Sequence, residues 1–227
     1  MTTTLITGAN RGLGKETARQ LIALGHIVYV GARDESNGPA AAEELGARFV
    51  RLDVTDDASV AAAIARIDAD GGLDVLVNNA GIAKLGLNGP EALEVFDTNA
   101  VSVVRVTEAA LPLLRRSANP VVVNVSSALG SFAANHDPAR PASKVAAIVY
   151  GASKAAVSML TVQYARAVPE VKFNAVEPGY TNTGLGGVDN SHGRPVEVSA
   201  RTVVRVATIG PDGPTGTFQE DDAELGW

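Results

Sequence analysis

The sequence predicts a single α/β domain in which helices cover both faces of a parallel sheet. Short apolar segments alternate with longer amphipathic segments along the chain, the pattern of strands joined by right-handed helical crossovers. Hydrophobic residues make up 46% of the 227 residues but aromatic residues only 4%, so Ala, Val, Leu and Ile must build the core. This composition favours helices packed closely on a buried sheet over an aromatic-rich sandwich.

The elements alternate without a linker, repeat or low-complexity tract, which indicates one domain over residues 1–227. The short apolar runs predict strands, in order, at Thr3–Thr7, Ile27–Gly31, Arg48–Leu52, Leu73–Asn78, Val121–Val125, Lys172–Val176 and Thr215–Gln219. The amphipathic stretches between them predict helices at Gly12–Leu24, Ala40–Leu45, Ala58–Ile67, Pro90–Arg116, Tyr150–Val168 and Glu197–Thr208. Ligands bind beyond the carboxyl ends of the strands in such sheets, so the residues after each strand are the candidates for chemistry.

Composition and charge disfavour several kinds of partner. The formal net charge of -6 is spread along the chain, without the basic stripe expected for nucleic acid or a polybasic membrane anchor. There is no cysteine, and His26, His136 and His192 lack metal-ligand spacing, so we expect neither disulfides nor a metal site. Met1–Ile6 leads straight into a turn without room for a signal peptide, and no apolar run approaches the ~20 residues of a transmembrane helix. We therefore expect a cytoplasmic protein.

A Gly-rich loop with the sequence TGANRGLG, at Thr7–Gly14, joins the first predicted strand to the first helix. Its small residues let the backbone approach a pyrophosphate, which then lies on the positive end of the helix. The glycine spacing differs from the commoner dinucleotide fingerprint, so an ordinary Gly-rich turn is the alternative. The predicted cofactor contacts in this loop are Gly8, Asn10, Arg11, Gly12, Leu13 and Gly14.

Two arginines favour NADP(H) over NAD(H). Arg33 comes just after the second strand, and Ala32 stands where a carboxylate would bind the ribose 2′-hydroxyl of NAD. Arg11 and Arg33 suit a 2′-phosphate, which a guanidinium can grip with two hydrogen bonds. The alternative is that both arginines are solvated surface residues. We predict that the cofactor is NADP(H).

Residues after the third and fourth strands are predicted to complete the cofactor site. Asp53 and Val54 could contact the adenine edge, although an Asp after a strand is also a good helix cap. The sequence NNAG ends the fourth strand, where Asn79, Ala80 and Gly81 would let the backbone pass close under the cofactor ribose. A plain Asn/Gly turn is the alternative.

Tyr150 and Lys154 are four residues apart at the start of a predicted helix, so their side chains share one face. An ammonium ~5 Å from a phenol, at an effective dielectric of ~20, is worth about 3 kcal/mol, or roughly two pKa units. We therefore expect Lys154 to lower the pKa of Tyr150 from its ordinary value near ~10. Ser126 and Ser127, after the fifth strand, offer a hydroxyl to an oxygen that gains charge as hydride arrives. Taken alone, these residues are also compatible with a packed Tyr, a solvated Lys and two loop serines.

Five motifs, in this order, resemble the short-chain dehydrogenase/reductase family: TGANRGLG, NNAG, the second serine of NVSS, YGASK and EPGYTNT. They extend through essentially the whole chain and are specific as a set. The resemblance implies a doubly wound Rossmann-type parallel sheet of about seven strands with helices on both faces. It also implies an NADP(H)-dependent, carbonyl-reductase-like enzyme that reduces an aldehyde or ketone to an alcohol, or catalyses the reverse reaction.

The resemblance further assigns roles to individual residues. Ser127 would polarise the carbonyl, Tyr150 would donate or accept the proton, and Lys154 would lower the pKa of Tyr150 and bind the ribose. Asn99 matches the asparagine that supports a proton relay through water to the lysine. The segment that closes over the nicotinamide would contribute Pro178, Gly179, Thr181 and Thr183.

One stretch departs from the family pattern. The interval between Ser127 and Tyr150 is longer than in many members, and the additional residues lie around Phe132–Val145. We predict that this insertion shapes the substrate pocket, with a solvated excursion as the alternative, and that His136 is exposed rather than catalytic. The helices at Val101–Arg116 and Tyr150–Val168 could pair in a homodimer or homotetramer unless the insertion covers them.

The alternative function is a non-catalytic regulator that senses NADP(H) on the same fold. Such regulators usually lose part of the tyrosine, lysine and serine set, whereas this chain has all of it, so an enzyme is favoured. A sugar-nucleotide epimerase or dehydratase is disfavoured by the short segment after Pro178. The expected substrate is a small carbonyl or alcohol compound.

Overall fold

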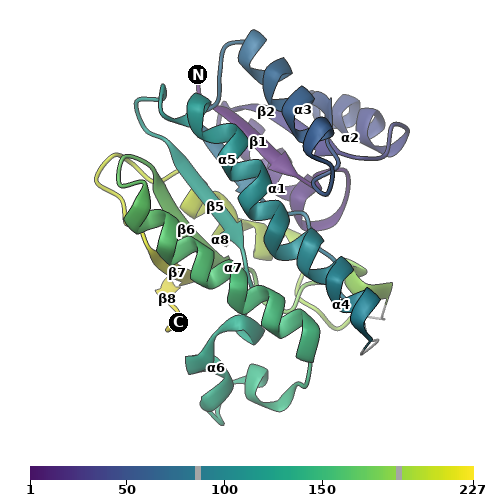
Figure 1. Cartoon of the computed structure of the whole chain (residues 1–227), viewed down its shortest axis with the longest axis vertical. Coiled ribbons are helices and arrows are strands. Elements are labelled where there is room, and N and C mark those ends of the chain that lie inside the picture. The colour runs from purple at the N-terminus through teal and green to yellow at the C-terminus, as the bar shows by residue number, and fades with distance from the viewer. Residues whose placement is uncertain (85–87, 188–190) are drawn as a thin grey trace.

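The computed structural model describes residues 1–84, 88–187 and 191–227. These residues form one eight-stranded sheet with helices packed around it (Figure 1). Its order is β3-β2-β1-β4-β5-β6-β7-β8, with β1 to β7 parallel and β8 antiparallel to β7. Because β1 pairs with both β2 and β4, the strand order reverses there, and doubly wound sheets bind ligands at such a switch point. The strands are β1 (Thr3–Thr7), β2 (Ile27–Ala32), β3 (Arg48–Arg51), β4 (Val75–Asn78), β5 (Val121–Val125), β6 (Lys172–Glu177), β7 (Thr217–Glu220) and β8 (Ala223–Glu224).

Helices cover both faces of the sheet. Helices α3, α5 and α7 lie over one face, with α5 and α7 in front of the sheet in Figure 1, and α1, α2 and α8 lie over the other. The helices are α1 (Gly12–Ala23), α2 (Asn37–Leu45), α3 (Asp57–Ala69), α4 (Gly89–Phe96), α5 (Ser102–Leu114), α6 (Phe132–His136), α7 (Ile148–Ala167) and α8 (Val196–Ala207). The predicted fold class is confirmed.

The two largest clusters of the core lie one on each face of the sheet. Leu5 and Val122 belong to the cluster packed with α3 and α5, whereas the next residues in their strands, Ile6 and Val123, pack with α1 and α8. All four side chains are fully buried. Successive strand residues point to opposite faces, so both faces of a doubly covered strand must be apolar, and short runs of Val, Leu and Ile result.

The structure differs from the predicted elements in several short segments. The continuous helical region expected at Pro90–Arg116 is α4, a π-helical turn at Asp97–Val101, and α5. The short helix α6 and the antiparallel strand β8 were not predicted. An element of two to five residues shows less than two periods of any hydrophobic pattern, so the sequence alone does not reveal it.

A buried amide pair links the ends of β4 and β5 to the helices above them. Asn78 Nδ2 donates to Asn124 Oδ1 at 2.9 Å, and Asn124 Nδ2 donates to Thr161 Oγ1 at 2.9 Å. Asn124 is fully buried. Replacing Asn124 with alanine is expected to destabilise the fold by about 1–3 kcal/mol, because the buried Asn78 donor loses an acceptor. Urea unfolding measures the loss, and equal midpoints for this variant and wild type would contradict the role.

The surface variant Asn37→Ala provides a control for that experiment. Asn37 Nδ2 bonds Asp34 Oδ2 at an exposed position, so its loss is expected to cost no more than about 0.5 kcal/mol. If both variants lost a similar free energy of unfolding, the loss would come from removing an asparagine side chain and not from its burial.

No helix within the described ranges is long and apolar enough to cross a membrane. The same residues hold no cluster of three or more His, Asp or Glu side chains arranged for a metal ion. His26 Nδ1 is hydrogen-bonded with Thr4 Oγ1 at 2.8 Å, and burial lowers the pKa of its imidazole. His136 is exposed, as predicted, and its Nδ1 lies 2.8 Å from Phe132 O.

Candidate active site

The Gly-rich loop leaves β1 and enters α1 at the switch point of the sheet, in contact with the NNAG turn after β4. Gly8 has a φ of 65°, and a methyl group there would lie 3.0 Å from Ala80 Cα. A methyl group at Gly14 would lie 2.5 Å from Asn79 Nδ2. Thr7 Oγ1 accepts hydrogen bonds from the backbone N–H groups of Asn79 and Ala80, at 3.0 and 2.9 Å. Glycine is therefore required where two loops predicted to bind the cofactor meet.

The start of α1 has the features of a phosphate site. Its N-cap, Arg11, has an extended backbone, and its side chain makes no capping hydrogen bond within the described chain. Lys15 N donates to Arg11 O at 3.2 Å, which is one of the first hydrogen bonds of the helix. The N–H groups before Lys15 have no acceptor within the helix, so they point out of its amino end. Unbonded N–H groups at the positive end of a helix are suited to a phosphate. A nicotinamide dinucleotide therefore fits this loop.

Arg11 and Arg33 are both exposed near this loop. Arg33 comes directly after β2, whose Gly31 pairs with Thr7 of β1. In the described ranges, no ion pair joins either guanidinium to a carboxylate. Both cations are thus available to an anionic ligand.

Asp53 organises its own turn. Its Oδ1 accepts from Thr55 N at 3.0 Å and from Thr55 Oγ1 at 2.7 Å. Burial acts to raise the pKa of Asp53, but these hydrogen bonds, with the charge of Arg33, hold it below the ordinary value. The cap of α3 is Asp56, which bonds Ala58 N and Ser59 N. The helix-cap alternative for Asp53 is therefore wrong, and its adjacent Val54 is buried.

Ser127, Tyr150 and Lys154 come together where β5 ends and α7 begins. The Ser127 hydroxyl is close enough to the Tyr150 phenol to act on its pKa, and it accepts a hydrogen bond from Leu129 N at 3.2 Å. Lys154 is only 4% exposed, and its Nζ donates to Val125 O at 2.8 Å and lies 5.7 Å from the centre of the Tyr150 ring. Ser126 is buried and donates to Lys154 O at 3.0 Å instead. Of the two serines, Ser127 is the one beside the phenol.

The expected effect of Lys154 on the pKa of Tyr150 is wrong for this structure. Burial raises the pKa of Tyr150 above its ordinary value, and the negative charge of Glu177 raises it further, while the Ser127 hydroxyl acts to lower it. Burial lowers the pKa of Lys154 to about 8, with Glu177 opposing the change. A single ammonium in a uniform dielectric would lower the pKa of a phenol, whereas desolvation has the largest effect on Tyr150.

Asn99 lies in the π-helical turn between α4 and α5 and is 1% exposed. Its side chain bonds both backbone groups of Ile82, accepting from N at 2.8 Å and donating to O at 2.9 Å, and also donates to Ser153 Oγ at 2.9 Å. A methyl group at Gly81 would lie 3.4 Å from Asn99 Oδ1 and 3.6 Å from Lys154 Nζ. The side chains of Asn99 and Lys154 therefore both approach Gly81. The π-helical turn that carries Asn99 is of a kind that is frequent at functional sites.

The segment after β6 reaches back over the Gly-rich loop. A methyl group at Gly12 would lie 3.4 Å from Thr183 Cβ, and one at Gly186 would lie 3.3 Å from Ala83 Cβ. Thr181 is turned inward, with its Oγ1 2.7 Å from Ser199 Oγ. Thr183 is therefore beside the predicted phosphate site, whereas the Thr181 hydroxyl is used within the protein. Residues 188–190 of this segment lie outside the described residues.

The insertion is docked on the C-terminal residues. Ser131 Oγ donates to Gly226 O at 2.6 Å, and Ala133 N donates to Trp227 O at 3.0 Å. Figure 1 shows α6 beyond the amino end of α7. Tyr150 belongs to the first turn of α7. A cavity of about 230 Å³ lies between the insertion and α7, lined by Leu129, Asn135, Val145, Ala146, Ala147, Ile148, Gly151 and Ala152. Ala134 and Ala142 are buried, whereas most other residues of the insertion are exposed, so a role in shaping the substrate pocket stays a prediction.

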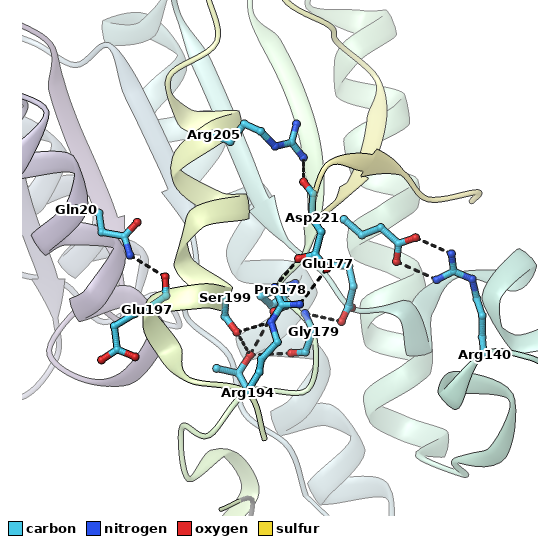
Figure 2. A network of polar contacts seen from close by, with 12 residues as sticks. Gln20, Arg140, Glu177, Pro178, Gly179, Arg194, Glu197, Ser199, Arg205 and Asp221 are labelled. Atoms are coloured by element: carbon cyan, nitrogen blue, oxygen red, sulfur yellow. Dashed lines mark hydrogen bonds and ion pairs between the residues drawn. The ribbon is translucent and has the colours of Figure 1, made fainter. Parts of the chain in front are cut away.

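Sequence reasoning missed Glu177, the last residue of β6. Its carboxylate accepts hydrogen bonds from Ala128 N and from Gly179 N, the latter at 2.8 Å (Figure 2). Both segments belong to the candidate site. The signal in the sequence was a charged residue at the end of an otherwise apolar strand, directly before Pro178.

Comparison with known proteins decides the family. The sequence profile described as short chain dehydrogenase matches residues 2–192. The chain belongs to the short-chain dehydrogenase family. This short-chain dehydrogenase is 35% identical over 242 residues to the short-chain dehydrogenase/reductase ATR10 of Stachybotrys chlorohalonatus, covering 95% of this chain and 87% of the relative. It is 29% identical over 307 residues to (-)-isopiperitenone reductase of Mentha piperita, covering 97% and 96%.

A solved structure agrees in fold. The NADPH-bound carbonyl reductase from chicken fatty liver superposes with a TM-score of 0.86 at 27% identity, covering 100% of this chain and 99% of that one. The family match makes this chain an oxidoreductase.

Proposed function

We propose that this short-chain dehydrogenase is an NADPH-dependent reductase of an aldehyde or ketone, with residues 1–227 acting as one domain. The observation that carries the proposal is the meeting of Ser127, Tyr150, Lys154 and Asn99 beside the Gly-rich loop. The carbonyl reductase from chicken fatty liver, which was solved with NADPH, supports both the substrate class and the cofactor.

The phenol of Tyr150 is the proton donor in this proposal. When bound, the reduced nicotinamide supplies a hydride to the carbonyl carbon, and the π electrons of the C=O bond pass to its oxygen. Ser127 hydrogen-bonds that oxygen and offsets its growing charge. Because burial raises the pKa of Tyr150, the phenol stays protonated at neutral pH and can give its proton to the alkoxide. The products are an alcohol and a phenolate.

Lys154 and Asn99 act on the phenolate that remains. The pKa of Lys154, about 8, leaves its ammonium largely charged at neutral pH and still able to release a proton. We assign Lys154 to hold the cofactor ribose and to return a proton toward Tyr150. Asn99, fixed by Ile82 and Ser153, would hold a water on the route to the lysine.

Arg11 and Arg33 are assigned to the 2′-phosphate of NADPH. Replacing Arg33 with alanine is expected to raise KM for NADPH by about 10- to 100-fold, because a hydrogen-bonded charge pair is lost, while KM for NADH changes little. Initial rates with each cofactor measure the change. Arg201→Ala, at an exposed site on α8, is the matched control. An equal rise of KM for both cofactors would contradict the assignment.

The direct test is a fluorescence titration with NADPH and NADH, followed by a panel of aldehydes and ketones monitored at the nicotinamide absorbance. Tighter NADPH binding with turnover of a carbonyl supports the proposal. Tight binding without turnover across a broad panel would favour the regulator that senses NADP(H). Failure to bind either cofactor would overturn the assignment of the Gly-rich loop.

A further inference from the structure

Glu177 links two segments of the candidate site through one carboxylate. Oε2 accepts from Ala128 N, the residue after Ser127, and Oε1 accepts from Gly179 N at 2.8 Å. The first bond fixes the chain that carries the Ser127 hydroxyl. The second fixes the turn from which the segment over the Gly-rich loop departs. Each oxygen therefore holds a different side of the site.

The neighbouring cations are engaged by other carboxylates. Arg140 of the insertion bonds both oxygens of Glu220, at 2.9 and 2.5 Å. Arg194 bonds both oxygens of Asp221, at 3.1 and 2.6 Å (Figure 2). Among the described residues, Glu177 has no ion-pair partner within 4.0 Å. Its charge is compensated mainly by backbone N–H groups, which leaves it able to act on other charges nearby.

Two of those nearby groups are Tyr150 and Lys154. The charge of Glu177 disfavours a phenolate at Tyr150 and favours an ammonium at Lys154, so it raises the pKa of both groups. The other charged groups that face Glu177 are Glu220 of β7, Arg194 before α8, and Arg140 of the insertion. Burial raises the pKa of Glu177 itself, and the two N–H donors oppose this. A partly buried carboxylate is costly, so packing alone does not explain it.

We propose that Glu177 is a positioning residue, which bridges the Ser127 segment and the Pro178–Gly179 turn and holds both in place. The proposal rests on the reductase function proposed above. It gives Glu177 a bridge between two peptide N–H groups, and the negative charge of the same carboxylate is a second, separable effect.

Glu177→Gln tests both effects with little change in side-chain size. The amide keeps one acceptor oxygen and places an NH2 group opposite the other peptide N–H, so kcat for carbonyl reduction is expected to fall roughly tenfold. Loss of the negative charge lowers the pKa of Tyr150 and of Lys154. The alkaline limb of the kcat/KM profile is therefore expected to move to lower pH by about one unit. An unmoved limb with only a lower urea midpoint would mean a purely structural role.

Two further variants separate charge from bridging. Glu177→Asp keeps the charge but is too short to reach both N–H groups, so kcat is expected to fall while the alkaline limb stays in place. Glu224→Gln removes a charge from the exposed strand β8 and is expected to leave the profile unchanged. A limb that moves equally in Glu224→Gln and Glu177→Gln would contradict a specific role for Glu177.

A readout independent of turnover distinguishes this proposal from the proposed function. NMR of isotope-labelled lysine, assigned with Lys154→Arg, follows the titration of Lys154 in wild type and in Glu177→Gln. A lower pKa of Lys154 in the variant supports the electrostatic role even if the wild type reduces no carbonyl, in which case only the reductase assignment fails. An unchanged pKa of Lys154 together with an unmoved limb overturns the proposal for Glu177.

Discussion

Replacing Tyr150 with phenylalanine is expected to lower kcat for carbonyl reduction by roughly 100- to 10,000-fold, the usual contribution of a positioned general acid. The ring remains, so the packing of the residue beside Lys154 is kept, and only the proton donor is lost. NADPH is expected to bind with nearly unchanged affinity. Steady-state rates and fluorescence titration of the same preparation measure the two quantities.

Tyr164→Phe is the matched control for this variant. Tyr164 lies on the same helix, α7, and its hydroxyl bonds Glu108 Oε1 at 2.7 Å at an exposed position. Its removal is expected to leave kcat within about twofold, as for a surface substitution. If Tyr150→Phe kept most of its turnover while binding NADPH, Tyr150 would not be the proton donor.

Gly130→Ala is expected to lower both stability and activity strongly. A methyl group at Gly130 would lie 2.5 Å from Ala155 N and even closer to the backbone of Lys154. Backbone atoms of α7 cannot give way as a flexible side chain can, so the turn at Ala128–Gly130 and the helix must separate. Overpacking of this kind costs about 1–3 kcal/mol. Displacing Ser127 from Tyr150 by ~1 Å is expected to lower kcat/KM by about 100-fold.

Urea unfolding and kcat/KM with one carbonyl substrate measure the two losses. Gly210→Ala is the control, because this exposed glycine lacks a positive φ and a methyl group there would meet nothing within 4 Å. An unchanged kcat/KM in Gly130→Ala would show that the close contact of the turn with α7 does not position the reacting groups.

The sequence by itself determined the layers of the fold and the residues that share a local element. Alternation of apolar and amphipathic segments predicts a doubly covered parallel sheet, because that pattern depends only on neighbouring positions. The four-residue spacing of Tyr150 and Lys154 places them on one helix face for the same reason. Ser127 and the Gly-rich loop were predicted from motifs that follow strand ends.

Only the tertiary structure decided how these residues affect one another. Glu177 bonds Ala128 from 49 residues away, and no local pattern predicts such a contact. The pKa of Tyr150 is raised because the fold buries the phenol. The spacing of Tyr150 and Lys154 in the sequence does not reveal that burial. The insertion likewise contacts the C-terminal residues, because Ala133 N donates to Trp227 O from 94 positions away in the chain. Periodicity determines which side chains share a face, whereas desolvation and long-range hydrogen bonds depend on which segments the fold brings together.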